Sequence, residues 1–316
     1  AKIKSYIYLK EKANLFFIDR VFLEHYNLRK VAIKERANMQ INFYTLFFWI
    51  IFFALFIIPS LRVKMIGAMR FQAIKNLEKK RGSRLITLIH RQEAFGFLGI
   101  PFYRYIDIED SEKILRAIRL TPDDMPIDII LHTPGGLVLA AEQIAHAIKR
   151  HKAKVTVFVP HYAMSGGTLI TLAADEVIMD EDAVLGSLDP QLGWEYPASS
   201  IIWASQAKDR DKLEDKTLIL IDVAQKAISQ LYFLVKDLLK EKMGEEKASD
   251  IAKILTEGRW THDYPLTVEK IKELGIKVKT GVPREVYELM ELYPQAGIRR
   301  PSVEYVPVPY KREKVK

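Results

Sequence analysis

Two glycine pairs and one serine are the residues of this sequence whose types and spacing could do chemistry. Gly135 and Gly136 close the stretch HTPGG, and Gly166 and Gly167 follow Ser165 in the stretch MSGG. Glycine is a poor helix former, so a pair at the start of a helix indicates that another group approaches the backbone closely. Backbone N–H groups at helix N-termini stabilise negative charge, and two of them near a reacting carbonyl form an oxyanion hole. The pattern predicts that Ser165 attacks a carbonyl carbon whose oxygen these amides hold.

Each of these features also has a simpler explanation. A glycine pair on its own can mark a tight turn that needs a positive φ. Serine is a favoured N-cap residue, so Ser165 could merely begin a helix. Two pairs that each follow an apolar strand, the second led by a serine, favour the chemical interpretation.

The elements that must position these residues alternate along the middle of the chain. Short, nearly continuous apolar runs typical of buried strands occupy residues 84–90, 126–133, 155–160 and 176–180. Helical patterns separate them at residues 110–119, 137–150 and 165–174. This alternation predicts an α/β fold with a mostly parallel sheet, in which ligands bind beyond the carboxyl ends of the strands. Both glycine pairs fall at that position.

The second half of the chain is predicted to be mainly helical. The run SIIWASQ at 200–206 is expected to form a strand, and long amphipathic helices are expected at 215–242 and 246–257. A loop, a helix and a final short strand are expected to follow. The basic, proline-interrupted residues 291–316 are expected to form a flexible tail.

The segment from LHTPGG to LDPQLG resembles the ClpP/crotonase superfamily, and within it the signal peptide peptidase A branch. It is most similar to the membrane-anchored serine dehydrogenase proteinase family, and the resemblance covers roughly residues 85–290. The resemblance implies stacked β-β-α units, Ser165 as nucleophile, and an oxyanion hole from Gly135, Gly136 and Gly166. It also implies assembly into homo-oligomeric rings or stacks.

The general base is the least determined part of the expected site. The ClpP branch uses a histidine in the stretch that corresponds to residues 186–191, but Leu188 occupies its place here. The signal peptide peptidase A branch uses a lysine about forty to fifty residues beyond its serine. The resemblance therefore implies a Ser–Lys dyad, with Lys208 as the first candidate and Lys212 and Lys216 as alternates. A lysine acts as a base only when it is desolvated or held near other cations.

The chain also contains histidines that could take part in the site. We expect His161 and His262 to line the pocket, and His262 could approach Ser165 if the chain folds it back. His132 is expected to be structural or to support the site indirectly. The remaining candidates are expected to be surface or packing residues, namely His90, His146 and His151. No spacing resembles a zinc site and the chain has no cysteine, so neither a metal nor a cofactor is expected.

Residues 37–61 carry no charge, and their core at 43–58 is almost continuously apolar. About twenty such residues span a bilayer, so the segment is predicted to be a single transmembrane helix. A basic leader at 1–36 precedes it and a basic juxtamembrane segment at 62–84 follows it, ahead of the catalytic domain. Met39 is a candidate natural start, in which case 1–38 would not be native. The bases after the helix then favour a cytoplasmic catalytic domain, with 62–84 on the anionic inner leaflet.

The net charge of +8 is unevenly distributed along the chain. Residues 1–36 contribute +5, residues 62–84 contribute +7 and residues 299–316 contribute +4, which leaves about −8 for 85–298. A nucleic-acid-binding protein carries its basic surface on the folded domain, so nucleic acid is not an expected partner. The expected partners are peptide or membrane-protein substrates, membrane lipid and further copies of the chain.

These observations favour a membrane-anchored serine endopeptidase. Two alternatives stay open: a crotonase-type acyl-CoA enzyme, which also holds a carbonyl oxygen with backbone amides, and a catalytically degenerate scaffold that binds protein segments.

Overall fold

The computed structural model describes residues 2–91, 104–193 and 196–293. The chain divides into two units, residues 1–68 and residues 69–316, which are described separately. The first unit is helical. It contains α1 (Lys2–Phe52), a π-helical turn (Phe53–Ile57) and the start of α2 (Ile58–Arg81).

Two helical stretches among the described residues are long and apolar enough to cross a membrane. The stretch Asn42–Arg81 has a mean hydropathy of 2.3 in its most apolar window, and none of that window is buried. The helix Asp215–Met243 is also long and apolar enough to cross a membrane, but 22% of its most apolar window is buried within the protein. The apolar helix expected at 37–61 is therefore present, whereas the second stretch is in part a core helix.

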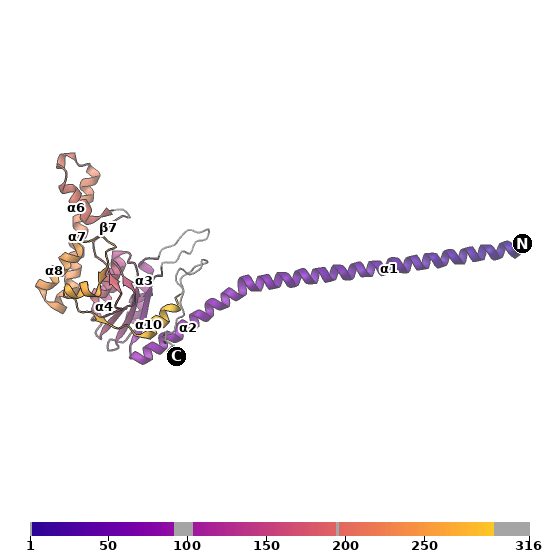
Figure 1. The fold of residues 1–316 in the computed structure, drawn as a ribbon, viewed down its shortest axis with the longest axis horizontal. Coiled ribbons are helices and arrows are strands. Elements are labelled where there is room, and N and C mark those ends of the chain that lie inside the picture. The colour runs from indigo at the N-terminus through magenta and orange to yellow at the C-terminus, as the bar shows by residue number, and fades with distance from the viewer. Residues whose placement is uncertain (1, 92–103, 194–195, 294–316) are drawn as a thin grey trace, which may run out of the picture. The chain divides into compact units, whose positions relative to one another are not determined.

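A five-stranded parallel sheet organises the second unit (Figure 1). Its strands are β1 (Arg84–Ile89), β2 (Ile127–His132), β3 (Val155–Val159), β5 (Glu176–Met179) and β10 (Lys279–Thr280), in the order β1-β2-β3-β5-β10. Every residue of β2 and β3 is buried, as expected for strands covered on both faces. The predicted α/β fold with a mostly parallel sheet is confirmed.

A smaller sheet lies beyond the ends of β2 and β3, where Thr133 bridges to Ala163, and Ser165 follows its first strand. It contains β4 (Tyr162–Ala163), β6 (Val184–Leu185) and β9 (Leu266–Thr267) in the order β4-β6-β9. β4 and β6 are parallel, whereas β6 and β9 are antiparallel. A separate two-stranded hairpin pairs β7 (Gln191–Leu192) with β8 (Tyr196–Pro197).

The helices of the second unit complete two layers around the sheet. After α2 they are α3 (Ile108–Arg119), α4 (Val138–Arg150), α5 (Gly166–Ala173), α6 (Ala198–Gln206), a 3-10 turn (Arg210–Lys212), α7 (Asp215–Met243), α8 (Glu245–Thr256), α9 (Val268–Glu273) and α10 (Arg284–Glu291). α3 begins with a capping box between Asp107 and Asp110, which satisfies two otherwise unpaired N–H groups.

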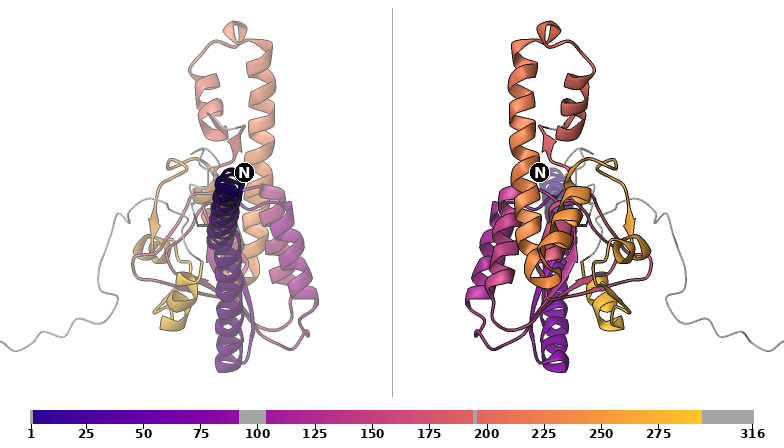
Figure 2. Two further views of the ribbon diagram at one scale, coloured as in Figure 1. Left: turned by 90° about the vertical axis from the view of Figure 1, so that its right-hand side faces the viewer. Right: turned by 90° about the vertical axis from the view of Figure 1, so that its left-hand side faces the viewer.

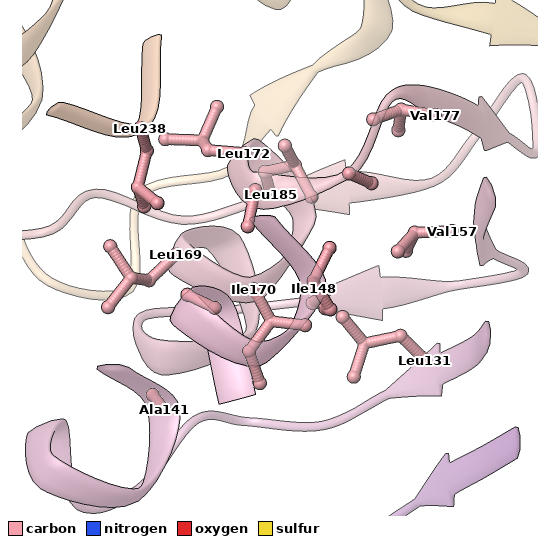
Figure 3. Packing of buried hydrophobic residues seen from close by; sticks show 14 of the residues in the cluster. Leu131, Ala141, Ile148, Val157, Leu169, Ile170, Leu172, Val177, Leu185 and Leu238 are labelled. Atoms are coloured by element: carbon pink, nitrogen blue, oxygen red, sulfur yellow. The ribbon is translucent and has the colours of Figure 1, made fainter. Parts of the chain in front are cut away.

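Successive residues of the strands face two different apolar clusters. Leu131 and Val157 join Ile170 and other residues of the covering helices in the larger cluster, part of which Figure 3 shows. Ile130 and Phe158, their chain neighbours, join the smaller cluster with residues of α2 and α10. This alternation places α4, α5, α7 and α8 on one face of the sheet and the end of α2 with α10 on the other.

The second half of the basic segment 62–84 packs on the sheet. Leu77 is buried in the smaller cluster, and the Arg81 guanidinium pairs with the buried carboxylate of Asp128. Arg70 donates to the Leu292 carbonyl at 2.9 Å, and its guanidinium carbon lies 4.1 Å from the centre of the Tyr293 ring. Residues 69–81 are therefore part of the folded body.

The prediction of a strand at 200–206 was wrong, because these residues form α6. The run is short and apolar, and such runs do not distinguish strand from helix by periodicity alone. α6 packs along α7 instead of joining a sheet, and the resulting α6–α7 hairpin extends beyond the sheet in both views of Figure 2. The tail expected at 291–316 lies outside the described residues from 294 onward.

Glu176 of β5 forms ion pairs with two lysines from neighbouring parts of the sheet. We expect these ion pairs to make the stability of the fold depend on pH. Its carboxylate accepts hydrogen bonds from Lys154, before β3, and from Lys279 on β10, and these bonds lower its pKa from 4.5 to about 2. A depressed pKa stabilises the fold above the unfolded value, so this contribution is present above pH 4.5 and is lost as the pH falls towards 2. Glu176→Gln is expected to cost about 1–2 kcal/mol at neutral pH, because both lysines are exposed to water. Thermal unfolding of the unmodified protein and of Glu176→Gln between pH 7 and pH 3 tests this prediction. A difference in stability between the two proteins that is as large at pH 3 as at pH 7 would contradict it.

Candidate active site

Ser165 occupies a strained turn between β4 and α5. Its φ of 49° and ψ of −117° lie outside the usual regions, and it is the one non-glycine residue with a positive φ in the described part of the chain. Such strain is retained where the surrounding structure fixes it, and it clusters at functional sites. The Ser165 side chain makes no capping hydrogen bond to α5 and is half-buried. The explanation of Ser165 as a simple N-cap therefore does not fit the structure.

The two glycine turns meet at Ser165. A Cβ atom added to Gly135 would lie 2.7 Å from the Ser165 Cβ atom and 3.2 Å from its hydroxyl oxygen. A Cβ atom added to Gly166 would lie 3.6 Å from the Gly136 nitrogen. Both contacts place the beginning of α4 beside the beginning of α5. The structure thus brings together the serine and the glycines that the sequence singled out.

A short backbone pairing fixes the first glycine turn. The Ile106 N–H donates to the Gly135 carbonyl at 2.7 Å, and the Leu137 N–H donates to the Ile106 carbonyl at 2.8 Å. A Cβ atom on Gly136 would lie 2.2 Å from the Ile106 oxygen, so only glycine allows this approach. The segment before α3 therefore sets the position of the turn.

The amide groups at the two turns are not equivalent. The Gly135 N–H donates to the Thr133 hydroxyl at 3.2 Å and is already used. Within the described ranges, the N–H groups of Gly136 and Gly166 donate to no protein acceptor. These two amides are the ones available to an oxyanion. α5 is buried along its whole length, and burial strengthens their effect on a developing charge.

The three histidines near the ends of β1, β2 and β3 differ in environment. His132 is buried, its ring stacks on His161 with centroids 5.7 Å apart, and burial lowers its pKa to about 3. It is therefore neutral. His90 is also buried and bonds to the Thr133 hydroxyl at 3.0 Å and to the Asp110 carboxylate at 3.1 Å. His161 itself is exposed.

His262 is bound to a carboxylate that the sequence analysis did not single out. Its Nδ1 atom lies 2.9 Å from Oδ1 of Asp189 in the loop after β6. The Asp189 side chain is 1% exposed and the His262 side chain is 34% exposed. Ser187 and Gln191 also donate to the Asp189 carboxylate, each at 2.9 Å. The sequence signal for this pair is Asp189 itself, which directly follows Leu188 in the stretch 186–191, where the ClpP branch has its histidine.

The three candidate lysines lie in and after the turn of the α6–α7 hairpin. Lys208 is exposed, and Lys216 is exposed in the first turn of α7. Lys212 forms an ion pair with Asp209 at 2.5 Å. Across the residues that the structure describes, no hydrogen bond or ion pair joins any of them to Ser165.

Lys242, unlike the three candidate lysines, is desolvated, but it lies at the end of α5 that is remote from Ser165. Burial lowers the pKa of Lys242 to about 8, and its ammonium donates to the Leu172 carbonyl at 2.7 Å and to the Ala174 carbonyl. These carbonyls close α5, whereas Ser165 precedes it. Eight residues of helix span about 12 Å, so Lys242 stabilises the end of α5 and does not reach Ser165.

In the described ranges, no group of three histidine, aspartate or glutamate residues is arranged to hold a metal ion.

Comparison with known proteins shows the family of this chain. The family model of ClpP-like SDH-type serine proteinases matches residues 34–316. An uncharacterised protein of Methanocaldococcus jannaschii is 60% identical over 286 residues, which are 90% of this chain and 96% of that protein. A second uncharacterised protein of that organism is 59% identical over 269 residues, which are 85% of this chain and 94% of that protein.

Two solved structures of proteases also resemble the chain. A membrane-bound stomatin-specific protease in a mutant form aligns with 60% of this chain and 79% of its own, with 21% identity and a TM-score of 0.40. A ClpP1 variant from Listeria monocytogenes aligns with 66% of this chain and 98% of its own, with 18% identity and a TM-score of 0.42. Because the family model covers most of the sequence and both Methanocaldococcus proteins match along most of their length, this chain belongs to the ClpP-like SDH-type serine proteinases.

Proposed function

We propose that this protein is a membrane-anchored serine endopeptidase with Ser165 as its nucleophile. Membership of a serine proteinase family supports peptidase activity. The observation that carries the proposal is the contact between the strained Ser165 turn and the Gly135–Gly136 turn, which leaves two unpaired amides beside one hydroxyl.

The proposed reaction proceeds through an acyl-enzyme. The Ser165 oxygen attacks the carbonyl carbon of a peptide bond while a base takes its proton, and the carbonyl oxygen becomes an oxyanion. The N–H groups of Gly136 and Gly166 stabilise that oxyanion. The proton passes to the leaving amine, the C–N bond breaks, and water then releases the acyl group from Ser165.

The lysine assignment stays a prediction, with Lys208 ahead of Lys212 and Lys216. In the single chain Lys208 is exposed, and an exposed lysine lacks the desolvation that makes a lysine a base. This assignment therefore requires a state in which substrate or another copy of the chain covers the α6–α7 hairpin.

The proposed anchor is the apolar helix beginning at Asn42, which is long enough to cross a bilayer and carries exposed apolar side chains along its length. A single pass with the catalytic domain on the cytoplasmic side would bring the site to membrane proteins or to peptides cut from them. We also propose a homo-oligomer. Trp203, Ile219 and Phe233 on the α6–α7 hairpin are 72%, 65% and 64% exposed, and such an apolar surface fits a contact between copies.

Ser165→Ala is expected to reduce peptide hydrolysis by at least about 10³-fold, because the nucleophile is removed while the fold is kept. Hydrolysis of fluorogenic peptides and labelling by a fluorophosphonate probe measure the effect. Ser200→Ala, at an exposed serine of α6, is the matched control and should behave as the unmodified protein. Unchanged hydrolysis in Ser165→Ala would refute the mechanism, and an unmodified protein that never labels would favour the scaffold alternative.

Gly135→Ala is expected to lower probe labelling by about 10²-fold, because a misplacement of the nucleophile near 1 Å has that cost. The added methyl group would lie 2.7 Å from the Ser165 Cβ atom, and the φ of +105° is unfavourable for alanine. Gly67→Ala, in a helix with nothing within 4 Å of the new atom, should label normally. Circular dichroism of both variants separates displacement of Ser165 from unfolding; full labelling by a folded Gly135→Ala protein would contradict the site.

Deletion of residues 1–61 is expected to move the protein from the membrane fraction to the soluble fraction, because the exposed apolar helix is removed. Fractionation of expressing cells by ultracentrifugation, with and without carbonate extraction, measures this. Replacement of the same residues by an unrelated apolar membrane helix should restore membrane association. A deleted protein that still sediments with membranes would show that another segment holds it there.

A further inference from the structure

A cavity lies at the end of α5 that is remote from Ser165. Its volume is about 410 Å³, which is within the range of small-molecule binding sites. The end of α5 and the start of β5 form one side, the junction of α7 and α8 forms another, and the segment between α9 and β10 forms a third. The cavity is separate from the candidate active site, because the eight residues of α5 lie between the two.

One part of the cavity wall is apolar. Leu172, Val177 and Leu185, which Figure 3 labels, come from α5, β5 and β6 and belong to the larger core cluster. The rest of this wall comes from α7 and the segment before β10, namely Leu239, Ile276 and Val278. A small polar molecule would leave the wall in contact with water. The lining therefore favours a ligand with an apolar body.

Three lysines from different elements border the same cavity. Lys242 lies near the end of α7, Lys247 lies in α8, and Lys277 precedes β10. A Cβ atom on Gly275 would lie 2.7 Å from Nζ of Lys247, so this side chain lies against the turn that borders the cavity. In the part of the chain that the structure describes, the ammonium groups of Lys247 and Lys277 have no acidic partner. Both are therefore available to a bound anion.

The carboxylate and the third ammonium group of the lining are already in part engaged. Asp175 is the one acidic residue of the described lining, and it accepts a hydrogen bond from the Val155 N–H at 2.7 Å. Lys242 donates to the Leu172 and Ala174 carbonyls, and an ammonium group has three N–H donors, so one remains. The cavity thus combines an apolar wall with a surplus of positive charge.

We propose that this cavity binds an amphipathic carboxylate, a molecule with one carboxylate group on an apolar chain. The carboxylate accepts a hydrogen bond from Lys242 and pairs with Lys247 and Lys277, while the chain lies against the apolar wall. Two sources supply this chemistry: a fatty acid, and an apolar peptide that ends in a free carboxylate. The site does not depend on the proposed peptidase function. A ligand bound there contacts the helix that begins at Ser165 without entering the candidate active site.

Lys242 gives the site a pH dependence. Burial lowers the pKa of Lys242 to about 8, so in the free protein this ammonium loses its charge as the pH rises above 8. A carboxylate binds the charged form, and its binding is therefore expected to weaken above that pH. The charged groups that face the Lys242 ammonium are Asp175 before β5, Lys149 of α4, Glu241 of α7, and the cavity lysines Lys247 and Lys277.

Isothermal titration calorimetry of the full-length protein in lipid nanodiscs, with empty nanodiscs as the blank, measures binding of octanoate and of acetyl-leucyl-leucine. The neutral amide of each acid is expected to bind at least about 10-fold more weakly, because it offers no charge to the lysines. Acetate is expected to bind at least about 30-fold more weakly than octanoate, because it lacks the apolar chain. Binding of either acid supports the site and shows which source fits it. Binding of neither acid, or equal binding of acid and amide, would overturn the proposal.

Lys247→Glu is expected to weaken binding of the acid about 5-fold or more, because it replaces an attractive charge at the cavity by a repulsive one. Lys253→Glu, at an exposed lysine of the same helix outside the cavity, is the matched control and should bind normally. The two variants have the same net charge. An equal loss of affinity in both would show that binding follows the overall charge, and would contradict a site in the cavity.

Lys242→Arg tests the origin of the pH dependence, because an arginine keeps its charge over the whole range. The unmodified protein is expected to bind the acid about 10-fold more weakly at pH 9.5 than at pH 7, whereas Lys242→Arg should bind about equally at both. A pH dependence that is the same in the two proteins would show that Lys242 does not hold the carboxylate.

Discussion

The close approach of the Gly135–Gly136 turn to the Ser165 side chain and the Met164 carbonyl is the constraint on which the rest of the site depends. Side-chain atoms cannot occupy that space: a single added Cβ atom would lie 2.7 Å from Ser165 or 2.2 Å from Ile106. The two helix N-termini can approach this closely because Gly135 and Gly166 carry no side chains: an added Cβ atom on Gly166 would lie 3.0 Å from the Ala141 Cβ atom. The free amides of the two turns therefore lie near Ser165, as the proposed oxyanion hole requires.

Several layers of structure hold that contact in place. The buried strands β2 and β3 end beside each other, so the turns that follow them are neighbours by topology. The pairing of Ile106 with Gly136 fixes the first turn from one side, and Gly186 and Thr168 fix the second from the other. At the far end of α5, Lys242 supplies donors to the last carbonyls. A helix supported at both ends can keep Ser165 in a backbone conformation that is costly by itself.

The end of the small sheet brings together side chains that no single sequence motif connects. Ser165, Asp189 and His262 come from three loops that are separated in sequence and are brought together by β4, β6 and β9. These strands have two residues each, too few to show an alternating pattern. The resemblance to the signal peptide peptidase A branch points instead to the lysines of the hairpin, because that branch places its lysine about forty to fifty residues beyond its serine.

The sequence by itself determined the parallel sheet, its covering helices and the apolar N-terminal helix, and it singled out Ser165 with its glycines as the candidate site. Local signals carry all of these: long apolar runs, helical periodicity and doubled glycines. Only the tertiary structure decided that residues 200–206 form a helix against α7, that residues 69–81 pack on the sheet, and that Asp189 holds His262. Each of those outcomes depends on a contact with a distant part of the chain, and a local pattern contains no information about such a partner.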